Sequence, residues 1–325
     1  MRLDGADPAS IARAAAALAA GELVAFPTET VYGLGARADD DAAVAQIFAR
    51  KGRPSEHPLI VHVAEPADAQ RFSDALPALA QRLMDAFWPG PLTVIVPRAP
   101  GVAGAAAGGQ TSIGLRCPSH PVAQALLRAA HGLGVPGVAA PSANRFGRIS
   151  PTQAAHVEAE FGADLLLLDG GACEVGIESS IVDCSRGSAV LLRPGVLTRE
   201  RIEAAAGQAL GEPDALAPRA SGTLESHYAP RARLRLMPPQ MLHRALQMLG
   251  EMPPGLAVYS RTVRPAVVGP RFRPMPSQPR QAAFELFATL RELDADGVQL
   301  IWVEEPPPDP AWDGVRDRLQ RAAAP

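Results

Sequence analysis

"AQIFARKGRPSEHPLIVHV" (residues 45–63) contains the segments from which an α/β domain is built. Its first part completes a helix-like stretch of residues 40–50, and its last part is a short apolar run typical of a buried strand. The polar loop between them carries Lys51, the only lysine among the 31 lysine and arginine residues of the chain. Similar helix-like stretches and apolar runs recur along the first two thirds of the sequence.

Short apolar runs predict strands over residues 22–26, 59–63, 92–97, 112–116, 137–141, 165–169, 180–183 and 189–193. Helix-like stretches lie between several of them, at residues 8–20, 40–50, 77–87, 120–131 and 151–161. The first of these helices has Asp7 as its predicted N-cap, with Pro8 at the first helical position. This alternation predicts an α/β or α+β domain over residues 1–207.

Residues 208–230 read as a linker, because their main part, "GEPDALAPRASGTLESHYAP" (211–230), has no apolar period and is rich in Pro, Gly, Ala and Ser. The remaining residues, 231–325, predict a smaller α/β domain. Its predicted strands are "RLRLM", "GLAVYS" and "VQLIWVE", and its predicted helices are 239–249, 280–293 and one at the end of the chain.

The composition, with 47% hydrophobic and 20% charged residues, indicates a soluble globular protein. A net charge of −3 argues against bulk attraction to nucleic acid, so any RNA contact should be local. Three cysteines without a C-x-x-C indicate neither a disulfide framework nor a zinc ribbon. The chain begins without the basic region of a signal peptide, and we expect a cytoplasmic protein without a membrane segment.

Lys51 and Arg53 predict an anion site, on irregular backbone just after a helix. An ammonium is a compact point charge that suits a polyphosphate, whereas a guanidinium suits planar bidentate contact. We therefore expect that an arginine at position 51 would be too long and too planar for the space. The alternative is a solvated loop lysine present by chance.

Ser142 and Asn144, in "PSAN", follow a short apolar run and could bind phosphate oxygens or a metal-bound water. An ordinary polar turn is the alternative. Arg116 ends the predicted strand 112–116 and is a natural bidentate partner for a carboxylate.

Three familiar kinds of site do not fit this sequence. "GLGVPG" (132–137) matches G-x-G-x-x-G but follows a helix pattern and contains Pro136, so it predicts a turn. There is no P-loop motif, no H-E-x-x-H and no G-x-S-x-G. The sequence therefore marks neither a zinc ligand set nor a protein nucleophile.

The ordered set "FPTETVYGLGA", "KGRPSEHPLIVHV", "FWPGPLTVIV", "RCPSHPVA", "APSANRFGRISPT", "LDGG", "GIESSIVD" and "LLRPG" resembles the YrdC-domain family. The "SHYAP" linker and the small domain after it are similar to the two-domain form of this family, the threonylcarbamoyl-AMP synthases. The resemblance implies a twisted open sheet with a concave ligand cleft, followed by a smaller Rossmann-like domain.

The resemblance also implies a nucleotidyltransferase. It would form threonylcarbamoyl-AMP and pyrophosphate from L-threonine, bicarbonate or CO2, and ATP. The product would serve a threonylcarbamoyl-transfer complex that makes N6-threonylcarbamoyladenosine beside the anticodon of tRNA. Mg²⁺ would come with the ATP phosphates and not through a protein metal site.

The residues implied for catalysis and nucleotide binding are Lys51, Arg53, Ser142 and Asn144, with further ATP contacts at His57, Ser112, Ser150, Arg193 and Tyr228. Those implied for L-threonine are Thr30, His62, Arg116, Ala140 and Ser180. The family usually has asparagine where His57 stands and threonine where Ser180 stands. The linker is expected to cover the active site, with Tyr228 reaching the phosphates.

The same fold also allows two alternative functions. Carbamoyl-adenylate formation is usually accompanied by an acylphosphatase domain and zinc-finger cysteines, which this sequence lacks. Binding of double-stranded RNA or ribosomes without catalysis is disfavoured by the net charge of −3.

Overall fold

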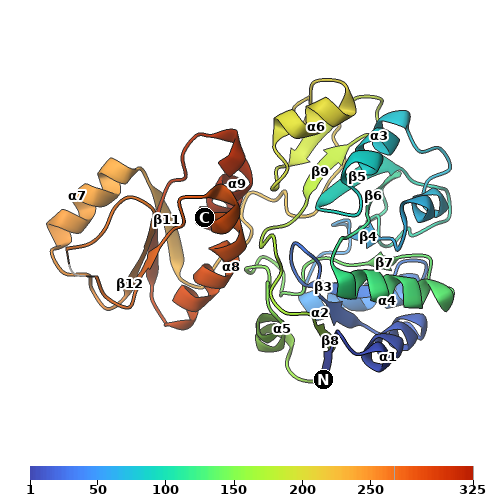
Figure 1. Ribbon diagram of the computed structural model, residues 1–325, viewed down its shortest axis with the longest axis horizontal. Coiled ribbons are helices and arrows are strands. Elements are labelled where there is room, and N and C mark those ends of the chain that lie inside the picture. The colour runs from blue at the N-terminus through green and yellow to red at the C-terminus, as the bar shows by residue number, and fades with distance from the viewer. Residues whose placement is uncertain (267, 325) are drawn as a thin grey trace.

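The computed structural model describes residues 1–266 and 268–324. Figure 1 shows a large N-terminal unit beside a smaller C-terminal unit, with an irregular segment running between them. Each unit is built on its own sheet, and the two sheets share no strand. The expected α/β fold class, with a large open sheet and a smaller second unit, is confirmed.

The large unit holds a ten-stranded mixed sheet. Its strands, in spatial order, are β1 (Arg2–Asp4), β8 (Leu166–Asp169), β2 (Val24–Phe26), β3 (Gly33–Arg37), β7 (Val138–Ala139), β4 (Ile60–His62), β6 (Ser112–Arg116), β5 (Leu92–Pro97), β9 (Ser180–Asp183) and β10 (Val190–Arg193). The helices of this unit are α1 (Pro8–Ala19), α2 (Asp41–Lys51), α3 (Ala78–Phe87), α4 (Pro121–Gly132), α5 (Ala154–Phe161) and α6 (Arg199–Ala206). A 3-10 helix, η1 (Pro66–Arg71), precedes α3.

Both faces of this sheet are buried, because successive residues of a strand point to opposite faces. On β2, Ala25 belongs to the core that α2, α3 and α6 cover. Its neighbours Val24 and Phe26 belong to a second core, shared with α1 and α4. Strands covered on both faces are apolar throughout, which is why the short runs were visible in the sequence.

Capping residues fix the ends of helices α1 and α2. The Asp7 carboxylate accepts the backbone N–H groups at the start of α1, as predicted, and Asp40 does the same for α2. Helix α2 ends at Gly52, whose φ of 64° is readily adopted only by glycine. The expectation that Lys51 lies on irregular backbone was therefore wrong: it is the last residue of α2, and Arg53 is the first residue after the cap.

Several short elements were not predicted from the sequence. Strand β3, "GLGAR", is glycine-rich and shows no period of two, and β1 and β13 (Phe272–Pro274) are three residues each. Helix α6 has charged residues at four of its first five positions, which hides its buried face. These segments are ordered by pairing with neighbouring strands or by packing, neither of which their own composition reveals.

The small unit has an all-parallel sheet in the order β11 (Arg233–Met237), β14 (Leu300–Glu304), β12 (Leu256–Ser260) and β13. Helix α7 (Pro239–Leu249) lies on one face of this sheet. Helices α8 (Pro279–Ala295) and α9 (Asp313–Ala323) lie on the other face, turned toward the large unit (Figure 1). A 3-10 helix, η2 (Pro310–Trp312), leads into α9. The two helices facing the large unit form the domain contact.

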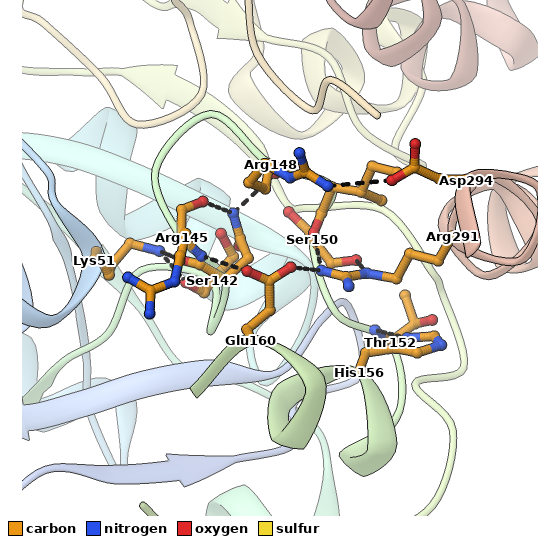
Figure 2. Close-up of polar contacts among 12 residues, drawn as sticks. Lys51, Ser142, Arg145, Arg148, Ser150, Thr152, His156, Glu160, Arg291 and Asp294 are labelled. Atoms are coloured by element: carbon orange, nitrogen blue, oxygen red, sulfur yellow. Dashed lines mark hydrogen bonds and ion pairs between the residues drawn. The ribbon is translucent and has the colours of Figure 1, made fainter. Parts of the chain in front are cut away.

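The contact between the units is both apolar and ionic. Ile149 and Ile177 of the large unit share one core with residues of α8 and α9. Arg291 of α8 pairs with Glu160 of α5 at 2.9 Å, and the side chain of Asp294 lies 3.2 Å from Arg148 (Figure 2). The small unit is thus docked against α5 and against the loops that carry Arg148, Ile149 and Ile177.

Gly314 marks a place where the backbones of the two units approach closely. A Cβ atom on this residue of α9 would lie 2.5 Å from the carbonyl oxygen of Gly195. Gly132, at the end of α4, has open space around the corresponding position. We therefore expect Gly132→Ala to stabilise the protein by up to about 1 kcal/mol through helix propensity. Gly314→Ala should destabilise it, because the added methyl group pushes α9 from the large unit.

Thermal unfolding of the two variants measures this difference, since both make the same chemical change within a helix. If Gly314→Ala raised the melting temperature as much as Gly132→Ala, the close approach of α9 to Gly195 would be wrong.

Candidate active site

A small cavity lies where the loops of the large sheet meet the linker. It is lined by Thr28, Val31, Gly33, Arg53, Ile60, His62, Arg116, Ala140, Pro141, Ser142, Glu178, Ser179, Arg193, Ser221, Gly222, His227 and Tyr228. Its volume is about 40 Å³, far below the roughly 300–1,000 Å³ of small-molecule pockets. Ser221, Gly222, His227 and Tyr228 of the linker form one side of its lining.

The cavity brings together part of the set expected from the sequence. Arg53, Ser142, Arg193 and Tyr228 of the expected nucleotide set line it, as do His62, Arg116 and Ala140 of the expected threonine set. The other expected residues, which do not line it, are Lys51, His57, Ser112, Asn144, Ser150, Thr30 and Ser180. Most of these lie directly behind the lining residues.

Two of the outlying residues are one hydrogen bond from the cavity wall. Thr30 contacts the hydroxyl of the lining residue Thr28, and Ser150 donates to Glu178. Ser180 follows Ser179 at the start of β9, and its buried hydroxyl has no partner among the described residues.

Ser112 and His57 lie farther to the side. Ser112 lines a separate cavity, under Ser221. The His57 ring stands edge-on to Phe146 at 5.5 Å.

Lys51 is buried beneath the "PSAN" loop, with 3% of its surface exposed. Its ammonium donates to the carbonyl oxygens of Ser142 and Asn144 (Figure 2 shows the contact with Ser142). Burial, followed by the nearby charge of Arg53, holds the pKa of Lys51 well below its usual value. A lysine in this position fixes the loop that carries Ser142, and among the described residues its ammonium hydrogen-bonds to backbone carbonyl groups and to no carboxylate.

Arg53 and Arg193 place two guanidinium groups at the wall under the linker. Arg53 donates to the carbonyl oxygen of Pro58 at 3.0 Å and to the Ser221 hydroxyl at 3.3 Å. Arg193 donates to the carbonyl oxygens of Ser179 and Ser221. Burial lowers the pKa of Arg53 to about 10. Among the described residues, both groups bond only carbonyl and hydroxyl oxygens, an arrangement that favours an incoming anion.

Arg116 and His62 line the cavity from the ends of β6 and β4. The Arg116 guanidinium lies 2.7 Å from the carboxylate of Glu29, and both side chains are 4% exposed. The Arg116 side chain is therefore already held by a carboxylate of the protein itself. Burial, and then the charge of Arg116, lowers the pKa of His62 to about 3, so His62 is neutral.

The linker closes the cavity with Tyr228. Its φ of 61° lies in the left-handed region, which costs a tyrosine of order 1–3 kcal/mol and is maintained here by packing. Its ring packs on His227 at 4.3 Å and on Phe287 of α8 at 5.4 Å. The hydroxyl is buried without a described hydrogen-bond partner and lies against Gly222. Burial raises the pKa of Tyr228 to about 12.

Sequence reasoning missed several residues of this cavity. Glu178 and Ser179 were inside the quoted segment "GIESSIVD", but nothing in its spacing shows that they face the cavity. Glu29 was inside "PTET", but its ion pair with Arg116 joins segments that are far apart in the sequence and meet only in the folded protein. Ser221, Gly222 and His227 of the linker come from a stretch without any period, so only the folded chain places them.

Residues 1–266 and 268–324 hold no group of three or more His, Cys, Asp or Glu side chains arranged to bind a metal ion. No helix in them is both long enough and apolar enough to cross a membrane.

Comparison with known proteins matches both units. Residues 16–195 match the Sua5/YciO/YrdC family, described as "Telomere recombination". Residues 197–324 match the family described as "Threonylcarbamoyl-AMP synthase, C-terminal domain".

Relatives match along nearly the whole chain. The threonylcarbamoyl-AMP synthase of Bacillus subtilis is 37% identical, over 98% of this chain and 93% of the relative. That of Pyrococcus abyssi is 35% identical, over 93% of this chain and 91% of the relative.

A solved structure, "Crystal structure of P. abyssi Sua5 complexed with L-threonine", superimposes with a TM-score of 0.86 at 33% identity. It covers 98% of this chain, and the alignment covers 95% of the solved one. The family models match the two units in order along the chain, and the relatives match over nearly its whole length. The chain belongs to the Sua5/YciO/YrdC family, in the two-domain form that carries the C-terminal domain of threonylcarbamoyl-AMP synthases.

Proposed function

We propose that this protein is a threonylcarbamoyl-AMP synthase, which makes threonylcarbamoyl-AMP and pyrophosphate from L-threonine, bicarbonate or CO2, and ATP. The observation that carries the proposal is the buried pair Arg53 and Arg193, which face the cavity without a carboxylate partner among the described residues. Relatives with this name match both units. Two guanidinium groups without a carboxylate partner favour the binding of a polyanion such as the ATP phosphates.

The reaction needs binding and positioning more than it needs a protein nucleophile. The amine of L-threonine takes up CO2 to give a carbamate, and a carbamate oxygen attacks the α-phosphorus of ATP. A P–O bond to the carbamate forms while the bond to pyrophosphate breaks. Negative charge develops on the leaving phosphates, where Arg53 and Arg193 stabilise it, and Lys51 holds the loop of Ser142 in position.

The threonine end of the site is assigned to Arg116, His62 and the residues around them. The Arg116 fork, already fixed by Glu29, presents its remaining donors to the carboxylate of L-threonine. The neutral His62 ring and the unpartnered Ser180 hydroxyl supply uncharged polar groups for the amine and hydroxyl. Thr30, through Thr28, and Ala140 complete this end.

The nucleotide end is assigned to Arg53, Arg193, Ser142 and Tyr228, with the remaining expected contacts at Asn144, Ser150, His57 and Ser112. The unpartnered Tyr228 hydroxyl would reach a phosphate oxygen. Mg²⁺ would be held by the phosphates and water, as magnesium prefers. Glu178 is the one carboxylate among the lining residues, and it is already bonded to Ser150 and Arg318.

In this proposal the chain is divided into a catalytic domain (1–207), a linker (208–230) and a C-terminal domain (231–325). The linker acts as a lid, because a cavity of about 40 Å³ cannot admit ATP unless residues 221–228 move. Closure then keeps water from the carbamate and from the mixed anhydride. The adenylate would pass to a cytoplasmic complex that modifies tRNA.

The reaction itself is tested by pyrophosphate release from ATP. We expect release to require both L-threonine and bicarbonate, because the carbamate is the nucleophile. Omission of either, or replacement of L-threonine by alanine, should reduce release to background. Equal release with no amino acid would contradict the proposed function.

The requirement for lysine at position 51 is tested by two opposite substitutions at neighbouring positions of α2, Lys51→Arg and Arg50→Lys. Lys51→Arg should lower kcat/KM for ATP by about 100-fold, roughly 2.7 kcal/mol, because the longer planar head cannot reach the two loop carbonyls in the same space. The neighbouring Arg50, which pairs with Asp164 at the surface, provides the control. Arg50→Lys should change the rate less than twofold. Near-normal activity of Lys51→Arg would mean that the lysine is accidental.

Gly222 tests closure of the linker. Its φ is +73°, and a Cβ atom there would overlap the Tyr228 hydroxyl, so Gly222→Ala should hold the linker open. Product formation should fall at least tenfold, and trypsin should cut faster after Arg219, the trypsin site of residues 211–230. In the wild type, ATP and L-threonine together should slow this cleavage.

The matched control is Gly211→Ala, where a Cβ atom meets only ordinary contact with Val190 at 3.4 Å. If Gly222→Ala and Gly211→Ala had equal rates of trypsin cleavage and equal rates of product formation, the linker would be only a tether.

A further inference from the structure

Arg318, on α9 of the small unit, reaches across the domain contact into the wall of the cavity. Its side chain has no exposed surface. Its Nε donates to the carboxylate of Glu178 at 2.9 Å, and one terminal nitrogen donates to the backbone carbonyl of the same residue at 3.1 Å. The other terminal nitrogen donates to the carbonyl oxygen of Pro194 at 2.7 Å. A single side chain of the small unit therefore fixes two segments of the large one.

Both segments carry residues of the cavity. Glu178 lines the cavity directly, and its second oxygen accepts the hydroxyl of Ser150. Pro194 follows Arg193, whose guanidinium bonds Ser179 and Ser221. A displacement of Arg318 would therefore change the positions of Glu178 and of the backbone beside Arg193.

Arg318 also supports the linker. Its guanidinium carbon lies 5.5 Å from the centre of the Tyr228 ring, a cation–π distance. Phe287 of α8 packs on the same ring at 5.4 Å. Arg318 therefore contacts both Glu178, through a hydrogen-bonded ion pair, and the ring of Tyr228, which has a left-handed backbone conformation.

The protonation of the pair is consistent with this geometry. Burial alone would raise the pKa of Glu178, but the charges of Arg318 and Arg193 and the Ser150 hydroxyl hold it below its usual value. The carboxylate is therefore ionised at neutral pH and binds Arg318 as an ion pair. Asp317, at 2.8 Å, supplies a second carboxylate to Arg318. Four acceptors for one guanidinium fix its orientation.

We infer that Arg318 is a positioning residue for the reaction, and that the small unit completes the active site by holding Glu178, the backbone beside Arg193, and Tyr228 in their closed arrangement through this one side chain. The inference rests on the proposed function for the identity of the reaction. It assigns a role to the C-terminal unit that a tether or a separate binding module would not have. Arg318 touches no reacting atom and acts through its neighbours.

The test separates positioning from simple stability. Arg318→Met should lower kcat at least tenfold while the affinity for L-threonine changes less than about threefold, because neither Arg116 nor His62 bonds to Arg318 or Glu178 among the described residues. Arg318→Lys should recover part of kcat, since an ammonium can hold Glu178 or Pro194 but not both. Arg148→Met removes another ion pair between the units, with Asp294, and should leave kcat unchanged.

A double variant covers the case in which Arg318→Met unfolds. That change leaves a buried, uncompensated carboxylate, which destabilises the protein, and adding Glu178→Gln neutralises it. We expect Arg318→Met with Glu178→Gln to regain the wild-type melting temperature without regaining kcat. If kcat returned with the melting temperature, or if Arg318→Met were fully active, Arg318 would be a structural residue only.

A second readout does not depend on the proposed function. In the ligand-free protein, trypsin should cut after Arg219 several-fold faster in Arg318→Met than in Arg148→Met or the wild type. If the wild type made no threonylcarbamoyl-AMP, the proposed function would fail, while this cleavage rate would still decide whether Arg318 holds the linker. Equal cleavage in all three proteins would overturn the inference.

Discussion

The central constraint in this structure is buried positive charge that has no carboxylate partner among the described residues. Lys51, Arg53 and Arg193 are each more than nine-tenths buried and bond carbonyl and hydroxyl oxygens. Desolvating a charge is costly unless dipoles or counter-charges compensate it, and dipoles compensate only part. A polyanion would complete the compensation. The surrounding loops are arranged to hold these cations apart and ready.

The linker and the small unit follow from the same constraint. A cationic cleft open to water would screen its charges and expose a carbamate to loss, so the site benefits from a cover. In the proposed function residues 221–228 are this cover, held by hydrogen bonds from Arg53 and Arg193 to Ser221 and by the packing of Tyr228 on Phe287. The cover is itself supported from α8 and α9. The two units are therefore connected by chemistry at the site as well as by the apolar contact around Ile149 and Ile177.

Much of the fold could be predicted because its signals are local. Buried strands such as 92–97 and 112–116 are continuous apolar runs, and helices such as α1 carry an Asp cap and a proline at their start. β3 could not be found in this way, because a glycine-rich strand owes its order to the hydrogen bonds of β2 and β7 on either side. The backbone of Lys51 was misplaced for a similarly small reason, the cap one residue later at Gly52.

The sequence by itself determined the order of the main helices and strands and the charged residue types that the site can use, since Lys51, Arg53 and Arg116 are basic wherever they lie. Only the tertiary structure decided which of them share a cavity. Glu29 meets Arg116, and Glu178 meets Arg318 across 140 residues of chain. Such pairings are set by the order of strands in the sheet and by the docking of α9, and no spacing in the sequence encodes a distance between segments that meet only in the folded protein.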